Sequence, residues 1–126
     1  MTVVVQVSQA ETRLNEMTLK TSFEEDRGEF HLWNESGRFF IEYSGNADHS
    51  PAVVRRSEVP EEQVTFLMEK LDELKSLKNS PACENRELTV TYRVEDEIFE
   101  HKGCMDLQDK ISNRLYQLSS IMMILI

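Results

Sequence analysis

The chain has 126 residues, with 14 Lys and Arg against 23 Asp and Glu, so its formal net charge is −9. Because nucleic-acid backbones and anionic membranes attract basic proteins, this balance argues against direct binding to either. Hydrophobic residues make up 40% of the chain, which is enough to form a core and excludes a largely disordered protein. We expect a single domain spanning 1–126, since this length is typical of one domain.

Neither end of the chain resembles a targeting or membrane segment. The β-branched run Thr2–Val7 predicts a short strand, lacks a preceding basic region and is too short for a signal peptide. The C-terminal run 121–126 is also apolar, but a membrane-spanning helix needs about 20 such residues. We therefore expect a cytoplasmic protein in which Cys83 and Cys104, which lack CxxC spacing, are free thiols.

The N-terminal third contains a weak helix signal followed by strand signals. Ser8 and Glu11 fit a capping box for a short helix running to Met17, with an extended segment as the alternative. Alternation then predicts a strand over 17–23 and a charged turn at 24–28. Two further strands, at 30–33 and 38–43, flank a four-residue hairpin loop at 34–37, and another strand spans 52–59 after a loop at 45–51.

The clearest signal in the chain is a helix over 60–78. Its apolar residues recur at helical spacing and share one face, and Pro60 suits a helix start. Pro81 follows its predicted end, because proline cannot continue a helix. The apolar residues of this face are Val64, Leu67, Met68, Leu71, Leu74 and Leu77.

The last third predicts a second hairpin and a second helix. Residues 88–94 alternate as a strand, Glu95 and Asp96 form a turn, and a return strand runs from Ile98 to Gly103. Asp106 is a plausible N-cap for a helix over 106–125. The apolar face of that helix comprises Leu107, Ile111, Leu115, Leu118, Met122 and Leu125.

Together these elements predict an α+β fold, with a mostly antiparallel sheet of about five to seven strands covered by two main helices, 60–78 and 106–125. The end of the second helix, 121–126, is apolar on every side, and a helix of that kind is normally buried. A small domain would need another chain to bury it, which suggests a homodimer formed through the C-terminal helix.

No motif specifies catalysis, a metal or a cofactor, and we expect none of them. The adjacent Asp48, His49 and Ser50 contain the residue types of a hydrolase triad, but triad members converge from separate elements. His101 and Cys104 are close enough in sequence to be two metal ligands, yet no second ligand pair accompanies them. We therefore expect a protein that is not an enzyme.

The acidic turns and the aromatic residues are the best candidates for binding. If the hairpin tips share an end of the sheet, their carboxylates form a continuous negative surface that would steer a basic partner. Trp33 and Tyr43 could anchor such a partner, whereas core packing is the better interpretation of Tyr92. The predicted partner-binding residues are Glu24, Glu25, Asp26, Trp33, Glu95, Asp96, Glu97 and Glu100.

These features predict a non-enzymatic acidic protein that neutralises a basic protein, as immunity proteins and phage-encoded inhibitors do. One alternative is a dimeric secretion-type chaperone, which would hold a client in apolar grooves. A third is a small enzyme whose site would be a deep pocket near His31, His49 or His101.

Overall fold

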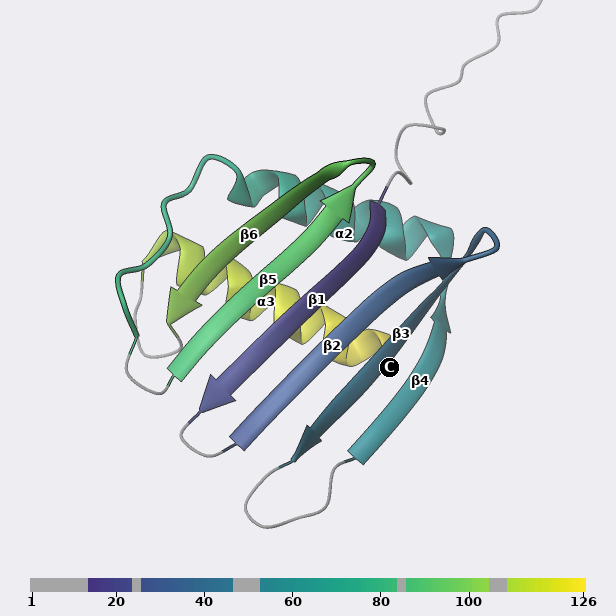
Figure 1. Cartoon of the computed structure of the whole chain (residues 1–126), viewed down its shortest axis with the longest axis horizontal. Helices are drawn as coiled ribbons and strands as arrows, with labels where there is room; N and C mark the ends of the chain where they lie inside the picture. Colours follow the sequence, from purple (N-terminus) through teal and green to yellow (C-terminus); the bar gives the residue numbers. More distant parts are fainter. Residues whose placement is uncertain (1–13, 24–25, 47–52, 84–85, 105–108) are drawn as a thin grey trace, which may run out of the picture.

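The computed structural model of the chain describes residues 14–23, 26–46, 53–83, 86–104 and 109–126. These residues form one six-stranded antiparallel sheet and two helices (Figure 1), which confirms the predicted α+β class. In chain order the elements are β1 (Leu14–Phe23), β2 (Asp26–Glu35), β3 (Arg38–Asn46), β4 (Val53–Val59), α2 (Glu61–Leu74), β5 (Arg86–Val94), β6 (Glu97–Cys104) and α3 (Lys110–Leu125).

The strands lie in the order β4-β3-β2-β1-β5-β6. The first four strands are a meander, and the chain then crosses by α2 to place the β5–β6 hairpin against the free side of β1. β1 therefore pairs with both neighbours, so that Leu19 lies opposite Phe30 on one side and Val90 on the other. These three side chains are buried, which shows why the sheet keeps this register: a slip of one residue would turn each of them to the opposite face.

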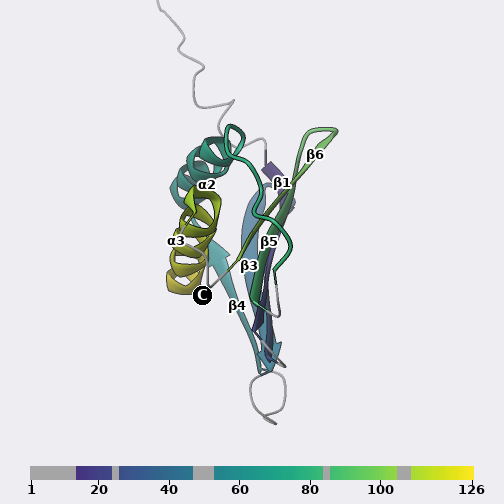
Figure 2. The same ribbon diagram turned by 90° about the vertical axis from the view of Figure 1, so that its left-hand side faces the viewer.

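Both helices lie on the same face of the sheet and leave the other face open (Figure 2). The predicted apolar face of α2 packs onto the sheet, and Leu71 is completely buried. α3 buries its own stripe beside β5 and β6, with Leu115 at its centre. The core is therefore a single layer between the sheet and the helices, as the amphipathic spacing of both helices predicted.

The β2–β3 turn is tighter than predicted. Glu35 pairs with Arg38, so the loop has two residues rather than four. Ser36 and Gly37 both have positive φ, 55° and 86°, which is the backbone of a type I′ turn. Asn34 belongs to β2, and its side-chain oxygen accepts a hydrogen bond from the Gly37 N–H at 3.1 Å. The four-residue loop was therefore wrong because Asn34, a turn-forming residue type, continues the strand.

Both helices are shorter than predicted. α2 begins at Glu61 with Pro60 as its N-cap, and it ends at Leu74 rather than at 78. α3 begins at Lys110, because the Asp109 carboxylate accepts a hydrogen bond from the Ser112 N–H at 3.0 Å and so caps the helix. The predicted N-cap at Asp106 was therefore wrong as the helix start, and that residue lies outside the described ranges.

At the N-terminal side, β1 begins at Leu14, so the segment from Leu14 to Met17 is strand and not the end of a helix. The extended alternative was the better one for this segment. The predicted strand Thr2–Val7, the capping box at Ser8 and most of the loop at 45–51 lie outside the described residues.

Candidate functional site

The open face of the sheet is mostly polar, and it carries an aromatic group near the β2–β3 turn. Alternation along β2 buries Phe30 and Leu32 under the helices and turns His31 and Trp33 outward. The Trp33 ring lies 5.0 Å from the His31 ring and 5.9 Å from the Phe40 ring, centroid to centroid. Trp33 is thus held, half-buried, on the open face of a strand between two aromatic neighbours.

Charged side chains from β1, β3 and β4 surround this aromatic group. Arg56 on β4 places its guanidinium 5.3 Å from the centre of the Trp33 ring, and it also donates to the Glu42 carboxylate at 3.0 Å. On the other side, His31 Nε2 lies 2.7 Å from the Glu16 carboxylate. Each charged group is therefore fixed in direction, although all of them remain in contact with water.

A second ion pair lies beside the first. Arg38 donates two hydrogen bonds to the Glu58 carboxylate, and its guanidinium lies 5.7 Å from the centre of the Phe40 ring. The hydrogen bonds from Arg38 lower the pKa of Glu58 below its ordinary value. This pair is fully exposed, so we assign it a role in shaping the surface rather than in stability.

These side chains border a shallow hollow of about 430 Å³ on the open face. We call it the Trp33 surface, and define it by its lining residues together with Phe40. It offers two aromatic rings, one imidazole, two guanidinium groups, two carboxylates and two amides, which suits a polar protein contact better than a small-molecule pocket. The lining residues are Asn15, Glu16, His31, Trp33, Asn34, Glu42, Arg56 and Arg93.

The β5–β6 hairpin brings predicted acidic residues to the same end of the sheet. Glu16 pairs with Trp33 on one side and with Arg93 on the other, so the hairpin tip begins only two residues beyond the Trp33 row. Glu95, at φ 56°, donates its N–H to the Asn15 side-chain oxygen at 2.7 Å, which fixes the tip to β1. Asp96 at this tip is exposed to solvent. So are Glu97 and Glu100, which follow on β6.

The other predicted acidic turn lies at the opposite end of the sheet. Leu14 pairs with Val94, whereas Phe23 pairs with Arg86, so the two turns are separated by the length of β1, roughly 30 Å at about 3.3 Å per residue. Glu24 and Glu25 lie outside the described residues, and Asp26 begins β2 at that far end. The two turns therefore do not form one continuous surface, and only the hairpin tip adjoins Trp33.

The remaining aromatic candidates lie on the helix side of the sheet. Tyr43 packs against Phe30, with ring centroids 4.7 Å apart, and covers the paired Gly28 and Gly45, where a Cβ would clash with its hydroxyl. Tyr92 is only 2% exposed, which confirms the core interpretation made for it. Neither ring is placed to anchor a partner on the open face.

Tyr92 instead forms a buried polar pair with His101. The Tyr92 hydroxyl lies 3.2 Å from His101 Nε2 and donates weakly toward the Leu71 carbonyl at 3.4 Å. Burial raises the pKa of Tyr92 to about 12 and lowers the pKa of His101 below its ordinary value, so both side chains stay neutral. Since His101 is 8% exposed and packed under α2, it is part of the core and not of an open pocket.

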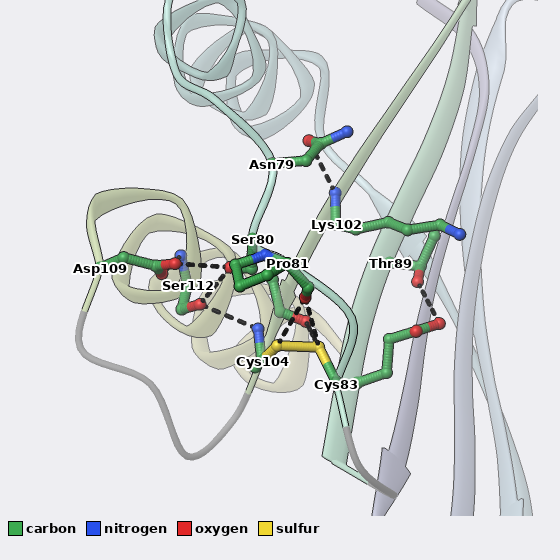
Figure 3. Close-up of a disulfide and its surroundings, with 11 residues drawn as sticks. Asn79, Ser80, Pro81, Cys83, Thr89, Lys102, Cys104, Asp109 and Ser112 are labelled. Carbon is green, nitrogen blue, oxygen red and sulfur yellow. Dashed lines mark hydrogen bonds between the residues drawn. A yellow bond between two sulfur atoms is a disulfide. The ribbon is translucent and has the colours of Figure 1, made fainter.

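The two cysteines form a disulfide, which corrects the expectation of free thiols (Figure 3). Cys104 ends β6, and Cys83 lies in the connection from α2 to β5. The Cys104 N–H also donates to Ser112 Oγ at 2.8 Å, so the bond lies beside the start of α3. No local spacing predicted this pairing, because the sequence does not reveal that the connection returns to the end of β6.

A hydrogen-bonded network joins the same three elements. Ser80 Oγ donates to Asp109 at 2.6 Å, and hydrogen bonds from Ser112 and Ser80 lower the pKa of Asp109. The disulfide and this network together hold the α2–β5 connection against β6 and α3 (Figure 3). Cys104 therefore has a structural role and is not available as a thiolate ligand beside His101.

Among the residues that the structure describes, no group of three or more His, Cys, Asp and Glu side chains could hold a metal ion. The Asp48-His49-Ser50 segment lies outside those residues. In the described parts of the chain, neither helix has the length and apolar character required to cross a membrane. Comparison of the sequence with known proteins finds no matching family model and no matching curated protein.

Proposed function

We propose that the protein is a non-enzymatic binding protein that neutralises a basic protein partner. The observation that carries the proposal is Trp33, a large, half-buried aromatic side chain on the open face that lies between His31, Phe40 and Arg56. Tryptophan and arginine dominate the energetics of protein interfaces, and a rigid sheet presents them without an ordering cost. The Trp33 surface is therefore the proposed centre of the contact.

The charge of the molecule supports a basic partner. Asp96, Glu97 and Glu100 are exposed at the tip of the β5–β6 hairpin and along β6, and they make no ion pair with any described residue. With a net charge of −9, they would accelerate association with a positively charged protein and fix its orientation. An immunity protein or a phage-encoded inhibitor acts in this way, and we place the protein in that class by analogy.

The test is affinity capture from the lysate of the source cell, followed by calorimetry with the purified partner. Trp33→Ala should weaken binding about 30-fold, the effect of losing roughly 2 kcal/mol at a hot spot. Tyr116→Ala is the matched control, because Tyr116 is an exposed aromatic residue on α3, on the other side of the molecule. Equal affinity of the two variants would contradict the assignment of the Trp33 surface.

The electrostatic part has its own test. A variant with Glu95, Asp96 and Glu97 changed to Lys should associate more slowly with the partner, and raising the salt concentration should reduce the difference. Binding that responds neither to these substitutions nor to salt would remove the basic partner from the proposal.

A dimeric secretion-type chaperone is the second candidate, and one observation favours it. Tyr116, Met123 and Ile124 on α3 are 56%, 55% and 82% exposed, although they are large apolar side chains. A second copy packed on α3 would cover them, as the apolar end of this helix suggested. Light scattering distinguishes the candidates, because a strict monomer at micromolar concentration contradicts the chaperone.

The compartment is part of the proposal as well. The cytoplasmic location expected from the sequence led us to expect free thiols, and Cys83 and Cys104 are paired instead. Because disulfides persist mainly in oxidising compartments, the pairing favours a partner met outside a reducing cytoplasm.

A further inference from the structure

We propose that the free edge of β6, at Ile98 and Glu100, accepts an extended segment of the basic partner as an added β-strand. The inference rests on the proposed function for the charge of the partner. It adds two points: β6 is the element with which the partner pairs, and an extended strand is the conformation in which the partner binds.

β6 is the outermost strand of the sheet, so within the described part of the chain one side of its backbone has no neighbouring strand. The Lys102 N–H donates to the Asn79 side-chain oxygen, and the Lys102 carbonyl accepts from the Ser80 N–H, both at 3.0 Å. These bonds identify Lys102 as a position whose backbone groups point away from β5. In an antiparallel pair such positions alternate, so the backbone groups of Ile98 and Glu100 also point outward.

The two halves of this edge differ. The half near Cys104 is closed by Asn79, Ser80 and the disulfide (Figure 3). The half near the hairpin tip is open, because neither Ile98 nor Glu100 makes a hydrogen bond to a described residue beyond its pairing with β5. An unpaired row of N–H and C=O groups is a ready template for another strand.

The side chains at the open half indicate what would bind there. Ile98 is 70% exposed on the open face, which leaves an apolar contact for a neighbouring side chain. Glu100 is exposed on the same face, and Glu97 is exposed on the other. An added strand with an apolar residue beside Ile98 and a Lys or Arg beside each carboxylate would satisfy all three positions.

The same charges disfavour the β6 edge of a second copy, since like charges on adjacent strands repel. In other proteins, charged residues on an edge strand act solely to prevent pairing with a strand of another molecule. At this edge, however, an exposed Ile lies next to an open backbone, and strand addition uses both features for affinity and specificity.

The test uses a fluorescent synthetic peptide that contains the segment Lys-Thr-Val-Lys, which in an antiparallel pairing places Val opposite Ile98 and one Lys opposite each of Glu100 and Glu97. A second peptide has the same sequence but is N-methylated at alternate amides. Both carry the same charge, but the second lacks the hydrogen-bond donors of one edge. The unmodified peptide should bind about tenfold or more tightly by fluorescence anisotropy. It should also slow hydrogen exchange at the amides of Ile98 and Glu100.

Two variants locate the binding. Glu100→Pro removes the outward N–H without removing a hydrogen bond to β5, and should abolish the advantage of the unmodified peptide. Glu100→Gln keeps that N–H, and should lower the affinity for both peptides while preserving their difference. Hydrogen exchange of the unsubstituted protein keeps the proposal testable even where the proline variant fails to fold, because unchanged exchange at Ile98 and Glu100 would contradict it.

Each other outcome has a distinct meaning. Equal binding of the two peptides would overturn strand addition and leave the basic partner in place. Binding of neither peptide would contradict both. Self-association of the protein that Glu100→Pro suppresses would show that a second copy occupies the edge, and would also overturn the proposal.

Discussion

The disulfide between Cys83 and Cys104 offers the sharpest test of the structure, because the sequence led us to expect free thiols. The two residues are separated by 21 positions. In the chain-entropy account, a cross-link over a loop of this length restricts the unfolded state enough to stabilise the fold by about 3 kcal/mol. The double variant Cys83→Ala with Cys104→Ala should therefore lose about 3 kcal/mol of unfolding free energy.

Urea titration followed by circular dichroism measures this loss. Reduction of the unsubstituted protein should shift its midpoint by about the same amount as the double substitution, while the reducing agent should leave the double variant unchanged. Thiol titration of the denatured, non-reduced protein is the direct control. Free thiols at both positions, or a stability change below about 0.5 kcal/mol, would refute the reasoning.

Three further perturbations test the core, a turn and the buried histidine. Leu71→Ala should lower the free energy of unfolding by about 2–5 kcal/mol in urea titrations, since Leu71 is completely buried. The partner affinity of the folded fraction should not change. A folded variant that no longer binds would show that α2 is an interface. Gly37→Ala should cost about 1 kcal/mol through backbone strain alone, because its φ is 86° and a Cβ there meets nothing, whereas Gly37→Asn should cost less. Burial lowers the pKa of His101, so the unfolded chain takes up the proton first as pH falls below about 6.5. Thermal stability should drop from that pH downward, and His101→Gln should flatten this part of the profile; an unchanged profile would contradict the assignment.

The candidate site was partly accessible from the sequence. Trp33 and the turn at Glu95 and Asp96 were predicted as contact residues, and the structure places them at one end of the sheet. The guanidinium of Arg56 was not anticipated, although it lies against the Trp33 ring. Arg56 is 23 positions away in sequence, and only the insertion of β3 between β2 and β4 brings the two residues to one face.

The sequence by itself determined the local elements, because the signals involved are local. Alternation and helical spacing depend on residues a few positions apart, and they correctly predicted the amphipathic helix containing Leu71 and the hairpin that turns at Glu95. The tightness of the turn at Ser36 and Gly37 was missed, because hairpins of two and four residues use the same residue types.

Only the tertiary structure decided how these elements are placed. The pairing of β5 with β1 puts the two acidic turns at opposite ends, and it leaves β6 as an edge. The β5–β6 pairing places Cys104 opposite Glu87, and the connection that precedes β5 folds back along β6, which brings Cys83 to Cys104. Strand order depends on contacts between distant segments, and the free energy of those contacts comes from burying one shared core, which no local pattern in the chain records.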